Sequence, residues 1–69
     1  MMVMLADNNL PMLPYGIYSR PSDERIELLA ERLVDIADAQ YMSDPSISTE
    51  TYDYWHKSLN KWLDWIYSL

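Results

Sequence analysis

Residues 43–49 (SDPSIST) constrain this chain most, because a long helical pattern lies on each side of them and they are the only connection between the two. Pro45 ends the first pattern, since the residue before a proline avoids the helical region of backbone space. Ser48 suits the N-cap of a second helix. Ile47 and Tyr52 then occupy the two positions of a hydrophobic staple, which fixes how the chain enters that helix. The stretch therefore predicts two helices folded back against each other.

The first helix is predicted over about residues 23–42. Ser22 is a good N-cap, and acidic residues follow it at the positive end of the helix dipole. Apolar residues recur along one face at helical spacing: Ile26, Leu29, Ala30, Leu33, Ile36 and Ala37. The opposite face carries five carboxylates within about 80° of one another, which we call the acidic row: Glu24, Glu27, Glu31, Asp35 and Asp38. We expect a solvated face or, alternatively, a surface that meets a basic partner or imitates DNA.

The second helix is predicted over about residues 49–68, with one apolar stripe. Tyr54 and Trp65 lie on its far side, where a single hairpin cannot bury them, so we expect a contact with a second copy or a partner; incidental exposure is the alternative. The residues predicted to form the core or a dimer interface are Leu29, Leu33, Ile36, Tyr52, Trp55, Leu59, Trp62 and Ile66.

Residues 1–21 are predicted to form an extended arm before a hairpin over residues 22–69. Pro11, Pro14 and Pro21 interrupt any helix there, yet the arm is too apolar for a loose tail. We expect a strap over its own helices or over a second copy, and alternatively a contact between a partner and residues 15–20. The fold class is therefore all-α, an antiparallel two-helix hairpin with an extended N-terminal arm.

Self-association is expected because a chain of 69 residues without cysteine buries only a modest core. Small folds usually add disulfides, a metal or a partner chain, and only the last is open here. Two copies are accordingly expected to pair as a homodimer with four helices.

Composition excludes several classes of function. The net charge of −6 disfavours direct binding of nucleic acid, which needs clustered lysine and arginine. His56 is the only histidine, and we expect it to be packed or at the surface rather than catalytic. No nucleophile motif, phosphate-binding glycine loop or metal-ligand spacing occurs, so we predict a non-enzyme without cofactor or metal. No apolar run reaches the length of about 20 residues that spans a membrane, and the first residues are too short for a signal peptide, so we expect the cytoplasm.

The loop and the start of the second helix carry a local resemblance. Residues 44–48 (DPSIS), followed by Tyr52-Asp53, resemble the turn between two N-terminal helices of NAD-dependent DNA ligases. In that family the helices help to hold nicotinamide mononucleotide, so the resemblance implies a nucleotide-binding remnant. Thr49 stands where the family has an acidic residue, Ala39-Gln40 stand where it has Tyr-His, and the adenylated lysine is absent. We therefore interpret the likeness as the same solution for a helical hairpin.

The overall pattern has a second resemblance, to small early proteins of bacteriophages. An acidic, cysteine-free helical hairpin of 69 residues with an arm and extra aromatics is similar to the phage quorum-sensing anti-activators. Those are dimeric helical hairpins that inhibit a LuxR-type transcription regulator and also a pilus assembly ATPase. The resemblance implies a host protein as partner, with a regulator favoured, and the bacterial cytoplasm as location.

Three hypotheses on function follow: a phage inhibitor of a host protein, an acidic DNA mimic of the anti-restriction or anti-CRISPR type, and the nucleotide-binding remnant. Aromatic residues and arginine dominate interface energies. The predicted contacts with a partner are therefore Tyr18, Arg20, Tyr41, Tyr54 and Trp65.

Overall fold

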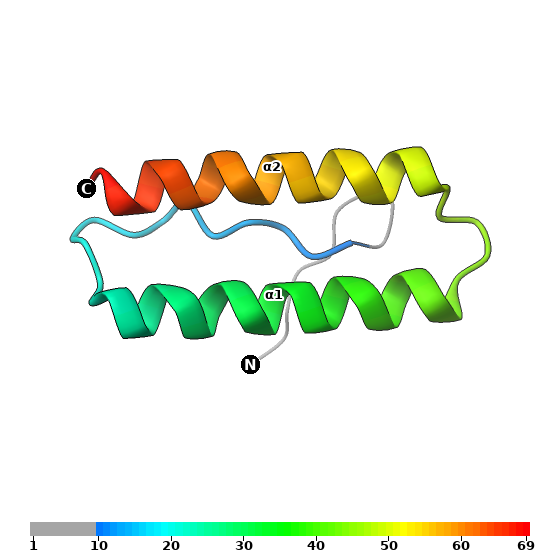
Figure 1. Ribbon diagram of the computed structural model, residues 1–69, viewed down its shortest axis with the longest axis horizontal. Coiled ribbons are helices and arrows are strands. Elements are labelled where there is room, and N and C mark those ends of the chain that lie inside the picture. Colours follow the sequence, from blue (N-terminus) through cyan, green and yellow to red (C-terminus); the bar gives the residue numbers. More distant parts are fainter. Residues whose placement is uncertain (1–9) are drawn as a thin grey trace.

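Two long helices lie side by side and antiparallel, joined by a tight loop (Figure 1). The computed structural model describes residues 10–69, with α1 at Asp23–Ser43 and α2 at Thr49–Tyr67. Each helix ends within one residue of the predicted boundary. This described part of the chain contains no strand, so the all-α hairpin is confirmed. Residues 1–9 of the predicted arm lie outside the described part.

Both helices begin at the predicted serine caps. The Ser22 hydroxyl accepts a hydrogen bond from the Arg25 backbone N–H at 3.2 Å, and the Ser48 hydroxyl accepts one from the Thr51 N–H at 3.1 Å. Each bond satisfies one of the amides that the first turn of a helix leaves unpaired. Losing such a cap costs roughly 1 kcal/mol, so these two serines define where the helices start.

The loop between the helices is held by Asp44. Its backbone N–H donates to the Gln40 carbonyl at 2.9 Å, which closes α1, and its carboxylate accepts the Ser46 N–H at 3.0 Å. Ile47 is buried and Tyr52 is half-buried, and both pack into the hydrophobic core, as the staple predicts. The loop is therefore fixed both by the hydrogen bonds of Asp44 and by the burial of Ile47 in the core.

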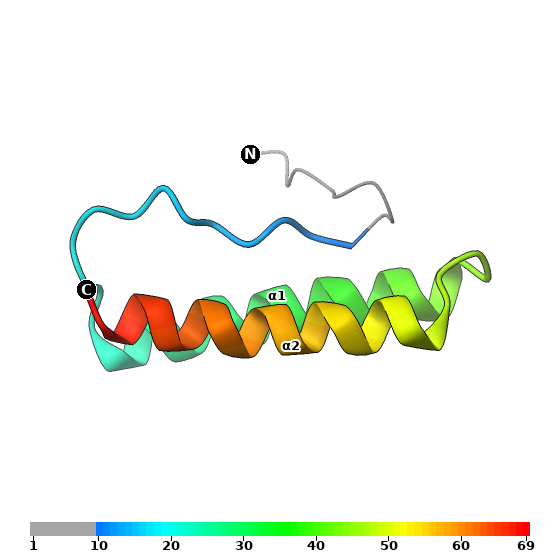
Figure 2. The same cartoon turned by 90° about the horizontal axis from the view of Figure 1, so that it is seen from above.

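Residues 10–21 of the arm cover one face of the helix pair and not the other. From Leu10 to Pro21 it runs in the same direction as α2, over the seam between the helices (Figures 1 and 2). Within this segment Leu10 and Pro11 are fully buried, and Leu13 and Ile17 are half-buried. The arm is thus a strap over its own helices, the first of the two predicted arrangements.

The core lies between the two helices and the arm. The buried apolar residues are Leu10, Ile26, Leu33, Ala37, Ile47, Trp55, Leu59, Trp62 and Ile66. Among the predicted core or dimer residues, Leu29, Ile36 and Tyr52 are only half-buried, because they lie at the edges of the apolar faces. Because the arm packs on the two helices, Trp55 and Trp62 are buried within one copy of the chain.

Candidate protein-binding groove between the arm and α2

Two tryptophans of α2 fasten the arm through hydrogen bonds of the same type. The indole N–H of Trp55 donates to the Pro11 carbonyl at 2.9 Å, and that of Trp62 donates to the Pro14 carbonyl at 2.9 Å. Seven residues of helix rise about 10.5 Å, and three residues of extended chain span about 10 Å. The spacing of the two tryptophans therefore matches the spacing of the two prolines.

The same two bonds also satisfy polar groups of both partners. A proline has no backbone N–H, so each of these two residues presents only a carbonyl to be satisfied. A buried indole needs an acceptor for its own N–H. Each of the two bonds satisfies both needs, and no buried side-chain polar atom in residues 10–69 lacks a partner.

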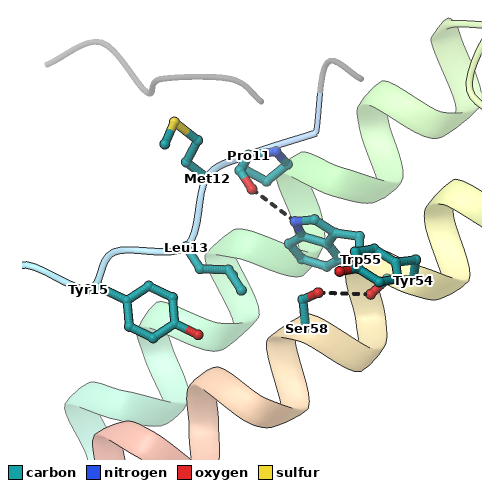
Figure 3. Close-up of a pocket in the computed structure, with 7 residues that line it drawn as sticks. All are labelled: Pro11, Met12, Leu13, Tyr15, Tyr54, Trp55 and Ser58. Atoms are coloured by element: carbon teal, nitrogen blue, oxygen red, sulfur yellow. Dashed lines mark hydrogen bonds between the residues drawn. The ribbon is translucent and has the colours of Figure 1, made fainter. Parts of the chain in front are cut away.

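An open groove remains between the arm and α2. Its volume is about 390 Å³, and Figure 3 shows arm residues on one side and α2 residues on the other. The lining residues are Pro11, Met12, Leu13, Tyr15, Tyr54, Trp55 and Ser58. Ser58 donates its hydroxyl hydrogen bond to the Tyr54 carbonyl one turn earlier, at 3.0 Å, so it offers little polarity to the groove. The groove suits an apolar side chain.

Exposed aromatic and thioether side chains border this groove. Tyr54 is 71% exposed, and Met12 and Tyr15 are each 52% exposed. The Tyr15 ring lies against Trp65, with 4.8 Å between ring centroids and a tilt of 50°. The contact holds Tyr15 at the edge of the groove while half of the side chain still faces solvent. Large, partly fixed tyrosines are the kind of side chain that carries binding energy in protein interfaces.

Arg20 fastens the other end of the arm. Its Nε donates to the Tyr67 carbonyl at 3.2 Å, its guanidinium lies over the Tyr67 ring at 5.3 Å, and it forms an ion pair with Asp23. The carbonyl belongs to the last turn of α2, where the negative end of the helix dipole favours a cation. Arg20 therefore stabilises the arm's return to α1, and only part of its guanidinium is free for a partner.

A second aromatic group joins the two helices on the face that residues 10–21 leave uncovered. The rings of Tyr41 and Tyr52 stack at 4.4 Å, and His56 meets Tyr52 edge-on at 4.6 Å. The Tyr52 hydroxyl donates to the Asp38 carboxylate, and the Tyr41 hydroxyl lies 3.0 Å from the Thr49 hydroxyl. The group thus couples the end of α1 to the start of α2.

Tyr52 is consequently hard to ionise. Its pKa is raised to about 12, chiefly because its hydroxyl donates to Asp38 and also because burial and nearby negative charge disfavour the phenolate. A raised pKa means that the folded state holds the proton more tightly than the unfolded state does, whose pKa is near 10. The resulting stabilisation is complete below about pH 10 and is lost as the pH rises towards about 12.

We expect this loss to be visible in the free energy of unfolding. Between about pH 10 and pH 12 the wild type should lose more stability than Tyr52→Phe, which has no proton to release. Urea unfolding followed by circular dichroism measures both proteins, and Tyr18→Phe, at a fully exposed ring, serves as the control. Equal losses in the wild type and Tyr52→Phe would contradict the hydrogen bond to Asp38.

The predicted partner contacts are spread over two faces. Tyr54 lines the groove, Trp65 lies beside it under Tyr15, and Tyr18 is 98% exposed farther along the arm. Arg20 lies at the arm's end. Tyr41 is on the opposite face with Tyr52. Trp65 was expected on an uncovered side of α2, whereas the structure has it half-buried and packed on the core beside the arm.

Residues 15–20 were an alternative partner contact in the sequence, but the groove that the arm forms with α2 was not predicted. Met12 and Tyr15 complete it, and neither belongs to a helical pattern that would place it. The sequence does contain a signal for the seating of the arm on α2. Pro11 and Pro14 are three residues apart, Trp55 and Trp62 are seven apart, and each buried indole needs an acceptor.

The described residues hold no group of three metal-ligating side chains, and neither of their helices is apolar enough over its length to cross a membrane. Comparisons with protein-family models, with curated proteins and with solved structures give no match.

Proposed function

We propose that this protein is a non-enzymatic inhibitor that binds a host protein through the groove between the arm and α2. The observation that carries the proposal is the groove itself, an apolar hollow bordered by exposed Tyr15 and Tyr54 on a fixed scaffold. Apolar anchors entering such a hollow, with aromatic residues around it, are typical of the centre of protein interfaces. Tyr18 extends the same surface along the arm.

The specific form of the proposal is that the partner is a LuxR-type quorum-sensing regulator, with a pilus assembly ATPase as a second target, in the cytoplasm of the bacterial host. Its support is the resemblance in length, acidity and hairpin pattern to the phage anti-activators. The confirmed hairpin is consistent with that resemblance, and many other small folds share this shape.

A second candidate function uses the acidic row. Glu24, Glu27, Glu31 and Asp35 are exposed along α1, and the one ion pair in residues 10–69 involves none of them. Asp38 differs from the others because it is half-buried and accepts the Tyr52 hydroxyl. Four unpaired carboxylates in line are suited to a DNA-binding protein, so a DNA-mimic inhibitor of a defence nuclease is the alternative. The nucleotide-binding remnant remains a prediction from the ligase resemblance alone.

Affinity capture from a lysate of a quorum-sensing host distinguishes the two candidates. We expect the wild type to capture a LuxR-type regulator and Tyr15→Ala/Tyr54→Ala to lose about 30-fold or more in affinity, the size expected for a hot spot of about 2 kcal/mol. Both side chains are at least half exposed, so the variant should unfold at nearly the wild-type urea concentration.

The matched variant is Glu27→Gln/Glu31→Gln/Asp35→Asn, which leaves the groove intact. Its capture of the regulator should be unchanged. If this variant fails to capture the partner and the groove variant succeeds, the partner binds the acidic row and not the groove, as the DNA-mimic function requires. Recovery of neither a regulator nor an ATPase would contradict the specific form of the proposal.

A further inference from the structure

A second surface lies on the side of the helix pair that residues 10–21 leave uncovered (Figure 2). Along α2, Tyr52, His56 and Leu63 lie on the opposite side of Trp62 from Tyr54 and Ser58, which line the groove. Tyr41 joins them through its stacking on Tyr52. We call this surface the arm-free face; its half-buried residues are Ala30, Val34, Tyr41, Tyr52, His56 and Leu63.

The centre of the arm-free face is apolar and shallow. Ala30, Val34 and Leu63 each pack on the core from outside and remain partly exposed. Two helices packed side by side present a seam between them, and an amphipathic helix can lay its apolar face along such a seam. At 1.5 Å per residue, the 21 residues of α1 make this seam about 30 Å long.

The edges of this face are negative. On α1, exposed Glu27 and Glu31 lie next to Val34, and Asp38 reaches across to Tyr52. On α2 the outer edge carries Asp53 and Asp64, with Lys57 as the one cation there. The other cations of the described helices, Arg25, Arg32 and Lys61, lie towards the arm or away from this face.

We propose that the arm-free face binds a basic amphipathic helix of a partner protein. A second copy of this chain would bring a net charge of −6 and the same carboxylate edges against this face, and like charges across an interface cost several kcal/mol. A basic helix places opposite charges there. The predicted homodimer through this face is therefore the less favoured occupant.

The chemistry of recognition follows from the residues present. Apolar side chains of the helix, spaced three and four residues apart, lie along Val34 and Leu63. Lysines or arginines on its flanks meet Glu27 and Glu31. An arginine at the loop end can stack on Tyr41 and share the Asp38 carboxylate, since guanidinium pairs well with both. This interaction does not depend on the groove, so it stands or falls separately from the proposed function.

The test uses the full chain and defined peptides. One peptide of about 18 residues carries leucines in a helical stripe with lysine and arginine on both flanks; the other has the same composition in an order without a stripe. In fluorescence anisotropy the striped peptide should bind at least about tenfold tighter, and more weakly as salt rises from about 50 mM to about 300 mM. Glu27→Gln/Glu31→Gln should weaken it several-fold, and Tyr54→Ala should leave it unchanged.

Equal affinity for the two peptides would overturn the proposal, because it would show attraction by charge alone. Loss of binding in Tyr54→Ala, with Glu27→Gln/Glu31→Gln unaffected, would also overturn it by moving the site to the groove. Sedimentation equilibrium gives the third decisive outcome. A micromolar homodimer that Leu63→Lys dissociates would assign the arm-free face to a second copy, whereas a monomer supports the proposal.

Discussion

Trp62→Ala is expected to remove most of the protein's stability. Trp62 is fully buried at the centre of the core, and its indole N–H donates to the Pro14 carbonyl at 2.9 Å. Replacing a buried tryptophan by alanine costs about 3–5 kcal/mol, and the half-buried Pro14 carbonyl also loses its donor. At roughly 0.05–0.15 kcal/mol per residue, a domain of this size has about 3–10 kcal/mol in total.

Circular dichroism during urea unfolding measures this effect, with Tyr18→Ala as the control because its ring is 98% exposed. The control should differ from the wild type by less than about 0.5 kcal/mol. Trp62→Phe separates the two contributions, since it keeps most of the apolar volume and loses only the donor. A loss below about 1 kcal/mol in Trp62→Ala would mean that the arm and helices do not meet at this residue.

Leu10→Ala is expected to have the second largest effect, about 2–5 kcal/mol. Leu10 lies outside both helices and is nonetheless fully buried in the same cluster as Trp55 and Trp62. Removing its side chain leaves a cavity under the strap, which neighbouring residues fill only in part. Tryptophan fluorescence should shift towards that of exposed indole at a lower urea concentration than in the wild type.

Met12→Ala provides the matched control for Leu10→Ala. It lies two residues farther along the same strap, has a side chain of similar size, and is 52% exposed at the rim of the groove. Its stability should stay within about 0.5 kcal/mol of the wild type. Similar losses of stability in both variants would indicate that the arm rests on the surface and that Leu10 is not buried in the core.

The helices and their ends were predictable because each rests on local chemistry. Ser22 and Ser48 cap helices wherever an amphipathic pattern follows them, and Pro45 ends α1 without help from the rest of the fold. The pattern also identified the buried side of α2, including Trp55 and Trp62. These features depend on neighbours within a few positions in the sequence.

The position of the arm was open from the sequence because it depends on contacts between residues more than 40 positions apart. Trp55 reaches Pro11, and Trp62 reaches Pro14, across the whole of α1. Trp65 illustrates the consequence: from α2 alone it is an aromatic on an uncovered side, whereas in the folded chain it packs against the core and against Tyr15 of the arm. The groove could not be predicted for the same reason, since four of its seven lining residues come from the arm.

The groove exists only if the arm is seated on α2 through Trp55 and Trp62. Hydrogen exchange of the three indole N–H groups, followed by nuclear magnetic resonance in the wild type, tests it most directly. The indoles of Trp55 and Trp62 donate to arm carbonyls and should exchange slowly, whereas the indole of Trp65 has no acceptor in residues 10–69 and should exchange fast. Equally fast exchange at all three would show that the arm is not seated and that the groove does not exist.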